Sequence, residues 1–365
     1  MPHTILKRFQ AKLTDGRGKP GGYPGDFEYS INFEKKSGTI TLILDSEMPK
    51  RTRGKSFWRR PDTWGLSILH ELMQTFQDSN RPRTFALEVR VAMPGEVNER
   101  SKFEALRRRL SYLAEVNKGV TTAFNAVLGI DIHLFSNGNV VDFDQIIPNA
   151  PAEHEIVIRN DYNSRDDKDV PGRLEKDLQA FLFGKGLYQD EGANIVPDLP
   201  PLTAIDSSMP HFSRCGSRRL ALLGEDFFFG AKLDKVKLMR EFPTGAFKEG
   251  KSRYNRLLPT WYIDFLTVNK HGELAAIETK FIEKGAAALE DVAQLLDYSL
   301  YFHYYRKELA EQLKKMGVNW KEDRKKICGY LVSNVFHERL NHLWRFYNQK
   351  PDLIHLKRIG MGCLV

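Results

Sequence analysis

The segment YIDFLTVNKHGELAAIETKF, from Tyr262 to Phe281, restricts the fold of this chain more than any other. Two apolar runs flank a polar stretch around Lys270, His271 and Gly272, which predicts two strands joined by a turn. Neither run alternates between apolar and polar residues, as a strand with one solvent-exposed face does. We therefore expect both runs to be central strands of a sheet.

Three ionisable side chains interrupt these strands: Asp264 in the first, and Glu278 and Lys280 in the second. A charge inside a sheet is costly unless a partner offsets it. Folding the hairpin brings Asp264 opposite Glu278 or one register step away, and the two-residue period puts Glu278 and Lys280 on one face. The alternative is a solvent-exposed hairpin with an ordinary Glu278–Lys280 ion pair, which the apolar surroundings disfavour.

Two carboxylates on one face repel each other unless a cation lies between them. Mg²⁺ suits such a place because it takes few protein carboxylates and keeps several of its waters. The main-chain carbonyl of Thr279 is a further candidate ligand, and we expect the Thr279 side chain on the opposite face. The arrangement favours metal-assisted attack of water on a phosphodiester, with Lys280 orienting the water or offsetting negative charge.

The spacing of these residues resembles a known signature. Asp264, thirteen further residues and then the run Glu278–Lys280 are similar to the D…(D/E)xK motif of the PD-(D/E)XK nuclease superfamily. Gln294 and Tyr298 lie on the helix expected after the second strand, and resemble the QxxxY motif of the RecB-like branch. The resemblance covers roughly residues 171–333.

The resemblance implies an α/β domain with a restriction-endonuclease-like αβββαβ core and a mixed central sheet. It implies that Asp264 and Glu278 bind Mg²⁺ or Mn²⁺ and that Lys280 activates the water. Ile263 stands where the superfamily's name has proline, but many members lack that proline. Both acids and the lysine are present, which argues against an inactive relative.

Other residues receive a role through the same resemblance. Glu175 lies on a helix expected from Pro171 to Gly184 and matches a helical acid that binds metal directly or through water; the alternative is an exposed helix residue. Gln294 and Tyr298 are four residues apart and share one helical face. They would line the site or contact nucleic acid, and the alternative is ordinary helix surface.

A polar, charged stretch, Asp161–Gly172, predicts a linker, and 365 residues exceed the usual size of one domain. We therefore expect an amino-terminal α/β or α+β accessory domain over residues 1–160, for recognition, sensing or assembly, and the nuclease domain over residues 161–365. The patterns in the first domain predict strands at Gly38–Asp45 and Thr84–Met93, helices at Asp62–Phe76 and about 98–128, and a hairpin turn at Asn137-Gly138.

In the second domain, residues 190–215 lack periodicity and predict a long loop. Two segments compete for the first strand of the core, Arg218–Gly230 and Lys235–Phe242. The later patterns predict a helix over 285–313, a strand over Lys325–Asn334, a helix over His337–Gln349 and a strand over Asp352–Ile359.

A net charge of +8 favours a polyanionic partner, and the resemblance makes this partner nucleic acid, with DNA favoured over RNA. The loop Lys248–Arg256 precedes the Asp264 strand and predicts phosphate and base contacts; a solvated loop is the alternative. A second basic segment, Lys50–Arg60, contains two aromatic residues, whereas the run Arg107–Arg109 on a helix predicts a mostly solvated face. The site-lining candidates in the loop are Lys251, Arg253, Tyr254 and Arg256.

The sequence also disfavours several classes of protein. No segment approaches the roughly 20 apolar residues of a membrane span, and the amino terminus has no secretory apolar run. Three scattered cysteines without CxxC spacing predict a reducing, cytoplasmic location. A zinc site is disfavoured because His211 and Cys215 are four residues apart but no second pair has ligand spacing. The oligomeric state stays open, although a homodimer would have two active sites and could cut both strands of a nucleic-acid duplex.

The function that these patterns favour is a metal-dependent nuclease in repair, restriction or anti-phage defence. Two alternatives stay open: a non-catalytic nucleic-acid-binding protein that retains the fold, and a sensor or assembly protein whose main function lies in the first domain. Cleavage specificity, and the choice between internal and end cleavage, do not follow from the sequence.

Overall fold

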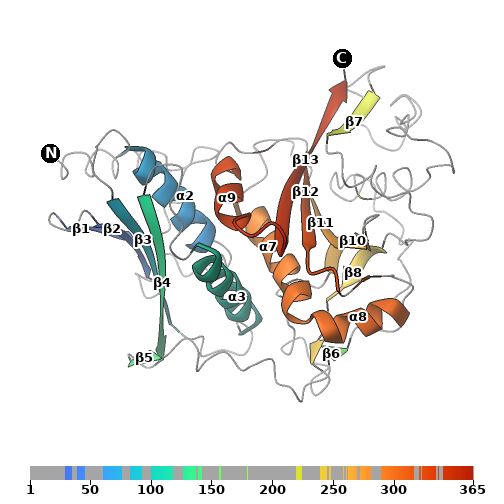
Figure 1. Ribbon diagram of the computed structural model, residues 1–365, viewed down its shortest axis with the longest axis horizontal. Helices are drawn as coiled ribbons and strands as arrows, with labels where there is room; N and C mark the ends of the chain where they lie inside the picture. The colour runs from blue at the N-terminus through green and yellow to red at the C-terminus, as the bar shows by residue number, and fades with distance from the viewer. Residues whose placement is uncertain are drawn as a thin grey trace. The chain divides into compact units, whose positions relative to one another are not determined.

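The chain forms two compact units in a computed structural model (Figure 1). The first comprises Met1–His154 together with Ala288–Ala293 and His337–Gln349, and the second comprises the remainder. The first unit thus includes segments that follow residue 160. The residues that the structure describes are 29–34, 39–45, 61–75, 83–92, 100–117, 126–136, 139–141, 156–157, 179, 219–223, 239–244, 246–247, 258, 260, 262–268, 272–280, 289–315, 320–321, 323–333, 336 and 340–364.

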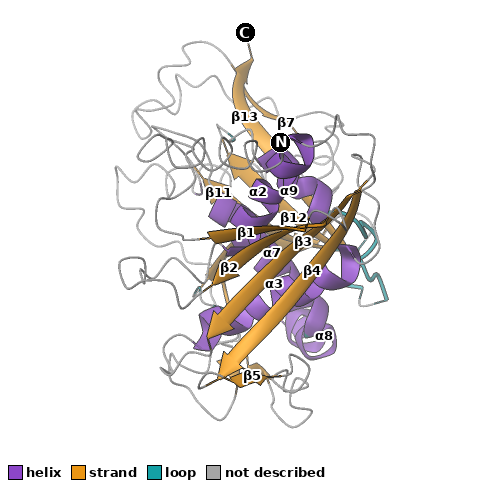
Figure 2. Cartoon of the chain, turned by 90° about the vertical axis from the view of Figure 1, so that its left-hand side faces the viewer, coloured by secondary structure: helices purple, strands orange, loops and turns teal. Residues whose placement is uncertain are grey.

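The first unit contains a mixed sheet with the strand order β1-β2-β3-β4-β5, seen across its face in Figure 2. The inner strands β2, β3 and β4 are parallel, whereas β1 and β5 each pair antiparallel with their neighbour. The bounds are Tyr29–Glu34 for β1, Thr39–Asp45 for β2, Arg83–Ala92 for β3, Ala126–Ser136 for β4 and Asn139–Val141 for β5.

Two helices, α2 (Pro61–Thr75) and α3 (Arg100–Asn117), cover one face of this sheet (Figure 1). A third, α9 (Leu340–Tyr347), packs against both. Leu66, Leu69 and Met73 recur at helical spacing in α2 and are buried. The predicted helix and strands of this region are therefore confirmed, to within two residues at each end.

The second predicted helix is shorter than expected. It was predicted to run to about residue 128, but α3 ends at Asn117 and β4 begins at Ala126. The Asn117 side chain donates from Nδ2 to the carbonyl oxygen of Leu113, 2.9 Å away, in the last turn. Gly119 and three β-branched residues follow in the sequence, and these residue types lower helix propensity.

The arginine run on α3 is buried, in contrast to the solvated face that the sequence predicts. Arg107, Arg108 and Arg109 have exposed fractions of 6%, 7% and 3%. Arg109 forms a two-point ion pair with Asp62 of α2, with Nε 2.8 Å from Oδ2 and Nη2 3.1 Å from Oδ1. Because Asp62 is fully buried, this paired charge explains why a guanidinium is tolerated between the helices.

The second unit contains a six-stranded mixed sheet with the order β7-β13-β12-β11-β10-β8. β8, β10 and β11 pair antiparallel, β11, β12 and β13 pair parallel, and β7 closes the other edge antiparallel. A short pair, β6 (Ile156–Val157) with β9 (Ala246–Phe247), lies apart from it. The bounds are Arg219–Leu223 for β7, Met239–Pro243 for β8, Tyr262–Val268 for β10, Leu274–Lys280 for β11, Ile327–Ser333 for β12 and Ile354–Leu364 for β13.

The hairpin predicted from the sequence is confirmed as the pair β10 and β11. Phe265 pairs with Ile277, and Val268 pairs with Leu274. Both strands have neighbours on both sides, and every described residue of β11 except Lys280 is buried. Of the two segments that compete for the first core strand, the later one forms β8 beside β10, and the earlier one forms β7 at the opposite edge.

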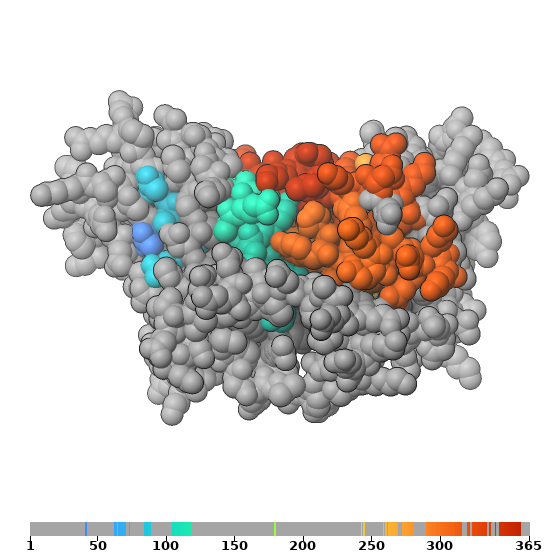
Figure 3. Space-filling model, turned by 60° about the horizontal axis from the view of Figure 1, so that its bottom comes forward, coloured from blue at the N-terminus to red at the C-terminus, as the bar shows by residue number. Residues whose placement is uncertain are grey.

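Two helices connect β11 to β12: α7 (Leu289–Tyr304) and α8 (Arg306–Lys315). They replace the single helix predicted over 285–313, and the backbone turns at Tyr305. Gly329 of β12 lets α7 approach closely, because a Cβ there would lie 2.8 Å from Ser299 Oγ and 3.1 Å from Leu295 Cγ. Side chains of α8 are visible in orange at the surface in Figure 3, and its buried residues are Leu309, Ala310 and Leu313.

Several predicted segments lie outside the described residues: the linker Asp161–Gly172, the loop over 190–215 and the basic segments Lys50–Arg60 and Lys248–Arg256. Within the helix predicted over Pro171–Gly184, only Gln179 is described, and it is helical. In the described part of the chain, no helix combines the length and the hydropathy that crossing a lipid bilayer requires. The fold as described is therefore of the α/β class, with a mixed sheet in each unit.

Candidate functional site

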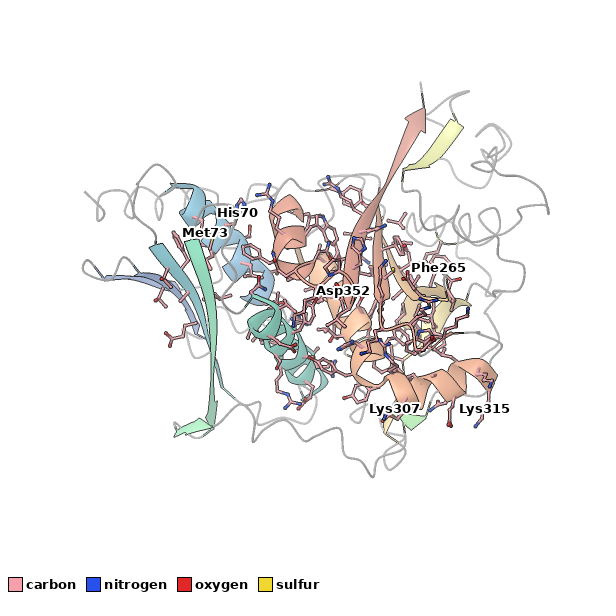
Figure 4. All side chains as sticks on the ribbon, in the orientation of Figure 1. His70, Met73, Phe265, Lys307, Lys315 and Asp352 are labelled. Carbon is pink, nitrogen blue, oxygen red and sulfur yellow. The ribbon has the colours of Figure 1, made fainter. Side chains whose placement is uncertain are left out.

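The site predicted from the sequence lies where β10 begins and β11 ends. The backbone pairing of the two strands is recorded from Val268↔Leu274 to Phe265↔Ile277. One residue further, Oδ2 of Asp264 accepts hydrogen bonds from the main-chain N–H of Thr279 at 2.8 Å and from its Oγ1 at 2.6 Å. The Asp264 carboxylate therefore accepts a hydrogen bond from a main-chain N–H of the neighbouring strand. Figure 4 labels Phe265, the residue that follows Asp264 in β10.

Thr279 differs from the expectation that its side chain points away from the site. Its hydroxyl donates to Asp264, and its exposed fraction is 0%. The strict alternation of a regular ladder predicts the opposite face. The expectation fails because the Asp264 carboxylate bonds both the N–H and the hydroxyl of Thr279, so the two side chains meet across the strands.

Gln179 is a site residue that the sequence did not single out. It is buried, with an exposed fraction of 1%, and its Nε2 donates to Thr279 Oγ1 at 3.1 Å. Its only sequence signal is its position four residues after Glu175, which places both on one face of a continuous helix. A buried amide needs a partner, and here the partner lies one hundred residues away along the chain.

Glu278 of β11 is held by a cation and an amide. Its exposed fraction is 1%, and its Oε1 lies 2.7 Å from Lys280 Nζ and 3.0 Å from Gln294 Nε2, which donates to it. Lys280 stays partly exposed at 18%. The ammonium group offsets a charge that burial would otherwise make costly.

Tyr298, also on α7, joins the two strands to the helix. Its hydroxyl donates to the Tyr262 carbonyl oxygen at 3.2 Å and accepts from Gln294 Nε2 at 2.5 Å. Burial raises the pKa of Tyr298 well above its usual value, and the negative charges of Glu278 and Asp264 raise it further. Through Gln294, the Tyr298 hydroxyl is therefore linked to the Glu278 carboxylate.

The structure brings together six of the residues predicted from the sequence, and their roles stay predictions. These residues are Asp264, Glu278, Thr279, Lys280, Gln294 and Tyr298, and Gln179 is an addition. The remaining candidates, Glu175, Lys251, Arg253, Tyr254 and Arg256, lie outside the described residues.

The donor set at this end of the sheet fits a hard divalent cation. Asp264 and Glu278 supply carboxylate oxygens, the ligand type that Mg²⁺ and Mn²⁺ prefer. Within the described ranges, no group of three or more His, Cys, Asp or Glu side chains is placed to hold a metal ion. The described part of the site therefore contributes two carboxylates, and any third acid has to come from outside it.

Comparison with known proteins returned nothing: no family model, no curated protein and no solved structure matches this chain. Function therefore has to be inferred from the site itself, because one fold can serve many activities. The site combines two neighbouring carboxylates, a partly exposed ammonium group and a buried hydrogen-bond network around them.

Proposed function

We propose that this protein is a Mg²⁺- or Mn²⁺-dependent nuclease that hydrolyses phosphodiester bonds, with DNA as its favoured substrate. One observation carries the proposal: Asp264 bonds Thr279 on the adjacent strand, and Glu278, the residue next to Thr279, pairs with Lys280. Two acids and a lysine in this arrangement are what metal-assisted attack on a phosphodiester needs.

The order of the elements supports a restriction-endonuclease-like core. The antiparallel strands β8, β10 and β11 are followed by α7 and then by β12, which is parallel to β11. Helical Gln179 precedes them and contacts the site, as the first helix of an αβββαβ core would. The acids lie on the two central strands of this arrangement, where the superfamily's signature has them.

In this proposal Asp264 and Glu278 bind the cation, and the Thr279 carbonyl and Glu175 are further ligands. Asp264 Oδ2 already holds two donors from Thr279, so we assign Oδ1 to the cation. When bound, the ion supplies a water of lowered pKa and offsets the charge that develops on the phosphate. Gln294 keeps Glu278 in place, and Tyr298 keeps Gln294 in place.

We assign Lys280 to the side of the site that faces the substrate. Its ammonium pairs with buried Glu278, yet the side chain retains an exposed fraction of 18%. From this position it would orient the attacking water and stabilise negative charge on the phosphate oxygens. The net charge of +8 and the basic loop with Lys251, Arg253, Tyr254 and Arg256 would bind the phosphate backbone.

Cleavage assays on plasmid and single-stranded DNA with Mg²⁺ or Mn²⁺ test the proposal. We expect Glu278→Gln and Lys280→Met each to lower the cleavage rate by about 100-fold or more. The chain offers a matched control pair. Lys326 Nζ lies 3.5 Å from Oε2 of Glu273, the residue that precedes the first residue of β11, at the opposite end of the strand from Lys280. Glu273→Gln and Lys326→Met should retain the wild-type rate.

Each other result of these assays has a defined meaning. Metal-independent cleavage, or equal loss in the control variants, would contradict the assigned site. Tight, salt-sensitive DNA binding without cleavage in either metal would favour the non-catalytic nucleic-acid-binding protein. Absence of both binding and cleavage would favour a sensor or assembly protein. Parallel assays on RNA decide the substrate class.

A further inference from the structure

We propose that Gln179 and Thr279 form a hydrogen-bond relay that positions the Asp264 carboxylate for the cation. This inference rests on the proposed function and deepens it, because it assigns a role to two side chains that the superfamily signature does not specify. Both side chains are positioning groups: they act through the Asp264 carboxylate and not on the substrate.

The direction of each hydrogen bond follows from the number of protons available. The Thr279 hydroxyl has one proton, and its oxygen accepts from Gln179 Nε2 at 3.1 Å. The proton is therefore directed toward Asp264 Oδ2, 2.6 Å away. The Thr279 N–H donates to the same Oδ2 at 2.8 Å, so both donors that hold this oxygen belong to one residue.

Burial makes this relay matter for the orientation of the carboxylate. Gln179 and Thr279 have exposed fractions of 1% and 0%, so water cannot easily replace a lost partner. Rotation of an aspartate carboxylate about its terminal bond is soft, so its orientation has to be imposed by its surroundings. With Oδ2 occupied by two donors, Oδ1 is the oxygen that faces a cation.

Glu278 is held by a different set of residues, namely Lys280 and Gln294. The relay hydrogen bonds end on Asp264, so we expect the two carboxylates to respond separately to substitutions. Changes within the relay should be non-additive, because breaking one hydrogen bond removes the effect of the next. Changes in the relay and at Gln294 should add.

The test measures Mn²⁺ affinity of the full chain by calorimetry, without DNA, and the Mn²⁺ dependence of cleavage in parallel. We expect Thr279→Val to weaken Mn²⁺ binding by about 10-fold, as residues that orient metal ligands do, and Thr279→Ser to stay within about 3-fold of wild type. Gln179→Leu should weaken binding, and the double variant with Thr279→Val should bind no more weakly than Thr279→Val alone.

A matched control is Thr267→Val in the same hairpin. Thr267 is buried, with an exposed fraction of 3%, and its hydroxyl has no hydrogen-bond partner among the described residues. This substitution should leave the Mn²⁺ affinity unchanged, whereas the same substitution at Thr279 should lower it. An equal loss in both variants would overturn the relay, because the loss would then reflect the hairpin as a whole.

The failure of the relay differs from the failure of the proposed function. If the wild type binds Mn²⁺ and Thr279→Val binds it equally well, or if the effects of Gln179→Leu and Thr279→Val add, the relay is wrong and the nuclease proposal stands. If the wild type binds no Mn²⁺, both are wrong. Should circular dichroism find Thr279→Val unfolded, Gln179→Leu decides, and an unchanged affinity in it overturns the relay.

Discussion

The Lys280 ammonium lies 2.7 Å from Oε1 of Glu278, a carboxylate with an exposed fraction of only 1%. The same pair is therefore a structural contact of β11 and the centre of the proposed chemistry. Stability and cation binding depend on this pair differently. A buried ion pair needs both partners to be stable, whereas a cation site needs the carboxylate alone.

This relationship predicts that a bound metal ion can restore the stability that is lost with Lys280, but not the catalytic activity. Lys280→Met should lower the free energy of unfolding by about 3 kcal/mol, because it leaves a buried carboxylate without its cation. Saturating Mn²⁺ should restore part of that loss by binding the folded state, and should stabilise the variant more than the wild type. Urea unfolding with and without Mn²⁺ measures both effects. Equal stabilisation of the two proteins would contradict the prediction.

The raised pKa of Tyr298 predicts an alkaline loss of stability. The unfolded chain releases this proton near pH 10.0, whereas burial and the charges of Glu278 and Asp264 keep it on the folded protein. The stabilisation is therefore complete below pH 10.0 and declines as the pH rises further. In the wild type, the free energy of unfolding should therefore fall by up to about 1.4 kcal/mol per pH unit through this group, and Tyr298→Phe should lack this part of the decline.

The measurement is the free energy of urea unfolding of both proteins at about pH 8 and above pH 10. At the lower pH, Tyr298→Phe should be less stable by about 1 kcal/mol, since the Tyr262 carbonyl loses a donor. The difference should shrink at the higher pH. A difference that stays constant with pH would show that Tyr298 titrates alike in the folded and unfolded states.

The short-range sequence pattern was enough to predict the hairpin and the placement of its charged residues where β10 begins and β11 ends. The apolar runs around Asp264 and Glu278 identify central strands, and the two-residue period brings their charged ends together. The sequence did not predict Gln179, because its partner Thr279 is one hundred residues away. It also placed the Thr279 side chain away from the site, whereas the Thr279 hydroxyl donates to Asp264.

Long-range contacts also explain why α9 belongs to the first unit. The last carbonyls of α9 accept from α3, with Tyr112 Oη donating to Tyr347 O at 3.0 Å and Asn117 Nδ2 to Phe346 O at 3.2 Å. These partners are more than two hundred residues apart in the chain. A helical pattern over His337–Gln349 predicts that α9 forms, but it carries no information on which sheet the helix accompanies.

The buried ion pair of α2 and α3 predicts an asymmetric response to mutation. Arg109→Met should lower the free energy of unfolding by about 3–5 kcal/mol, because Asp62 is fully buried and loses its partner. The double variant Asp62→Leu with Arg109→Met should recover most of that loss, since no buried charge is left. Arg345→Met, at an exposed arginine of α9, is the matched control and should be nearly neutral. Urea unfolding measures all three, and a double variant as unstable as Arg109→Met would contradict this account.

The close approach of α7 to β12 predicts that one methyl group can disturb the site from a distance. Gly329→Ala places a Cβ 2.6 Å from Leu356 Cδ2 and 2.8 Å from Ser299 Oγ, both too short for van der Waals contact. We expect a loss of about 1–3 kcal/mol in unfolding free energy, because the helix or the strand has to shift. Since α7 also carries Gln294, which donates to Glu278, cleavage should fall even where the variant remains folded.

A second substitution separates crowding from other causes. Leu356→Ala removes the Cδ2 atom nearest to the new methyl group, so it should destabilise the wild type more than it destabilises Gly329→Ala. Thermal unfolding of the four proteins of this cycle gives the coupling energy between the two positions. Strictly additive losses would mean that Gly329→Ala does not act through contact with Leu356 of β13, and would leave the contact of the new methyl group with Ser299 of α7 as the cause.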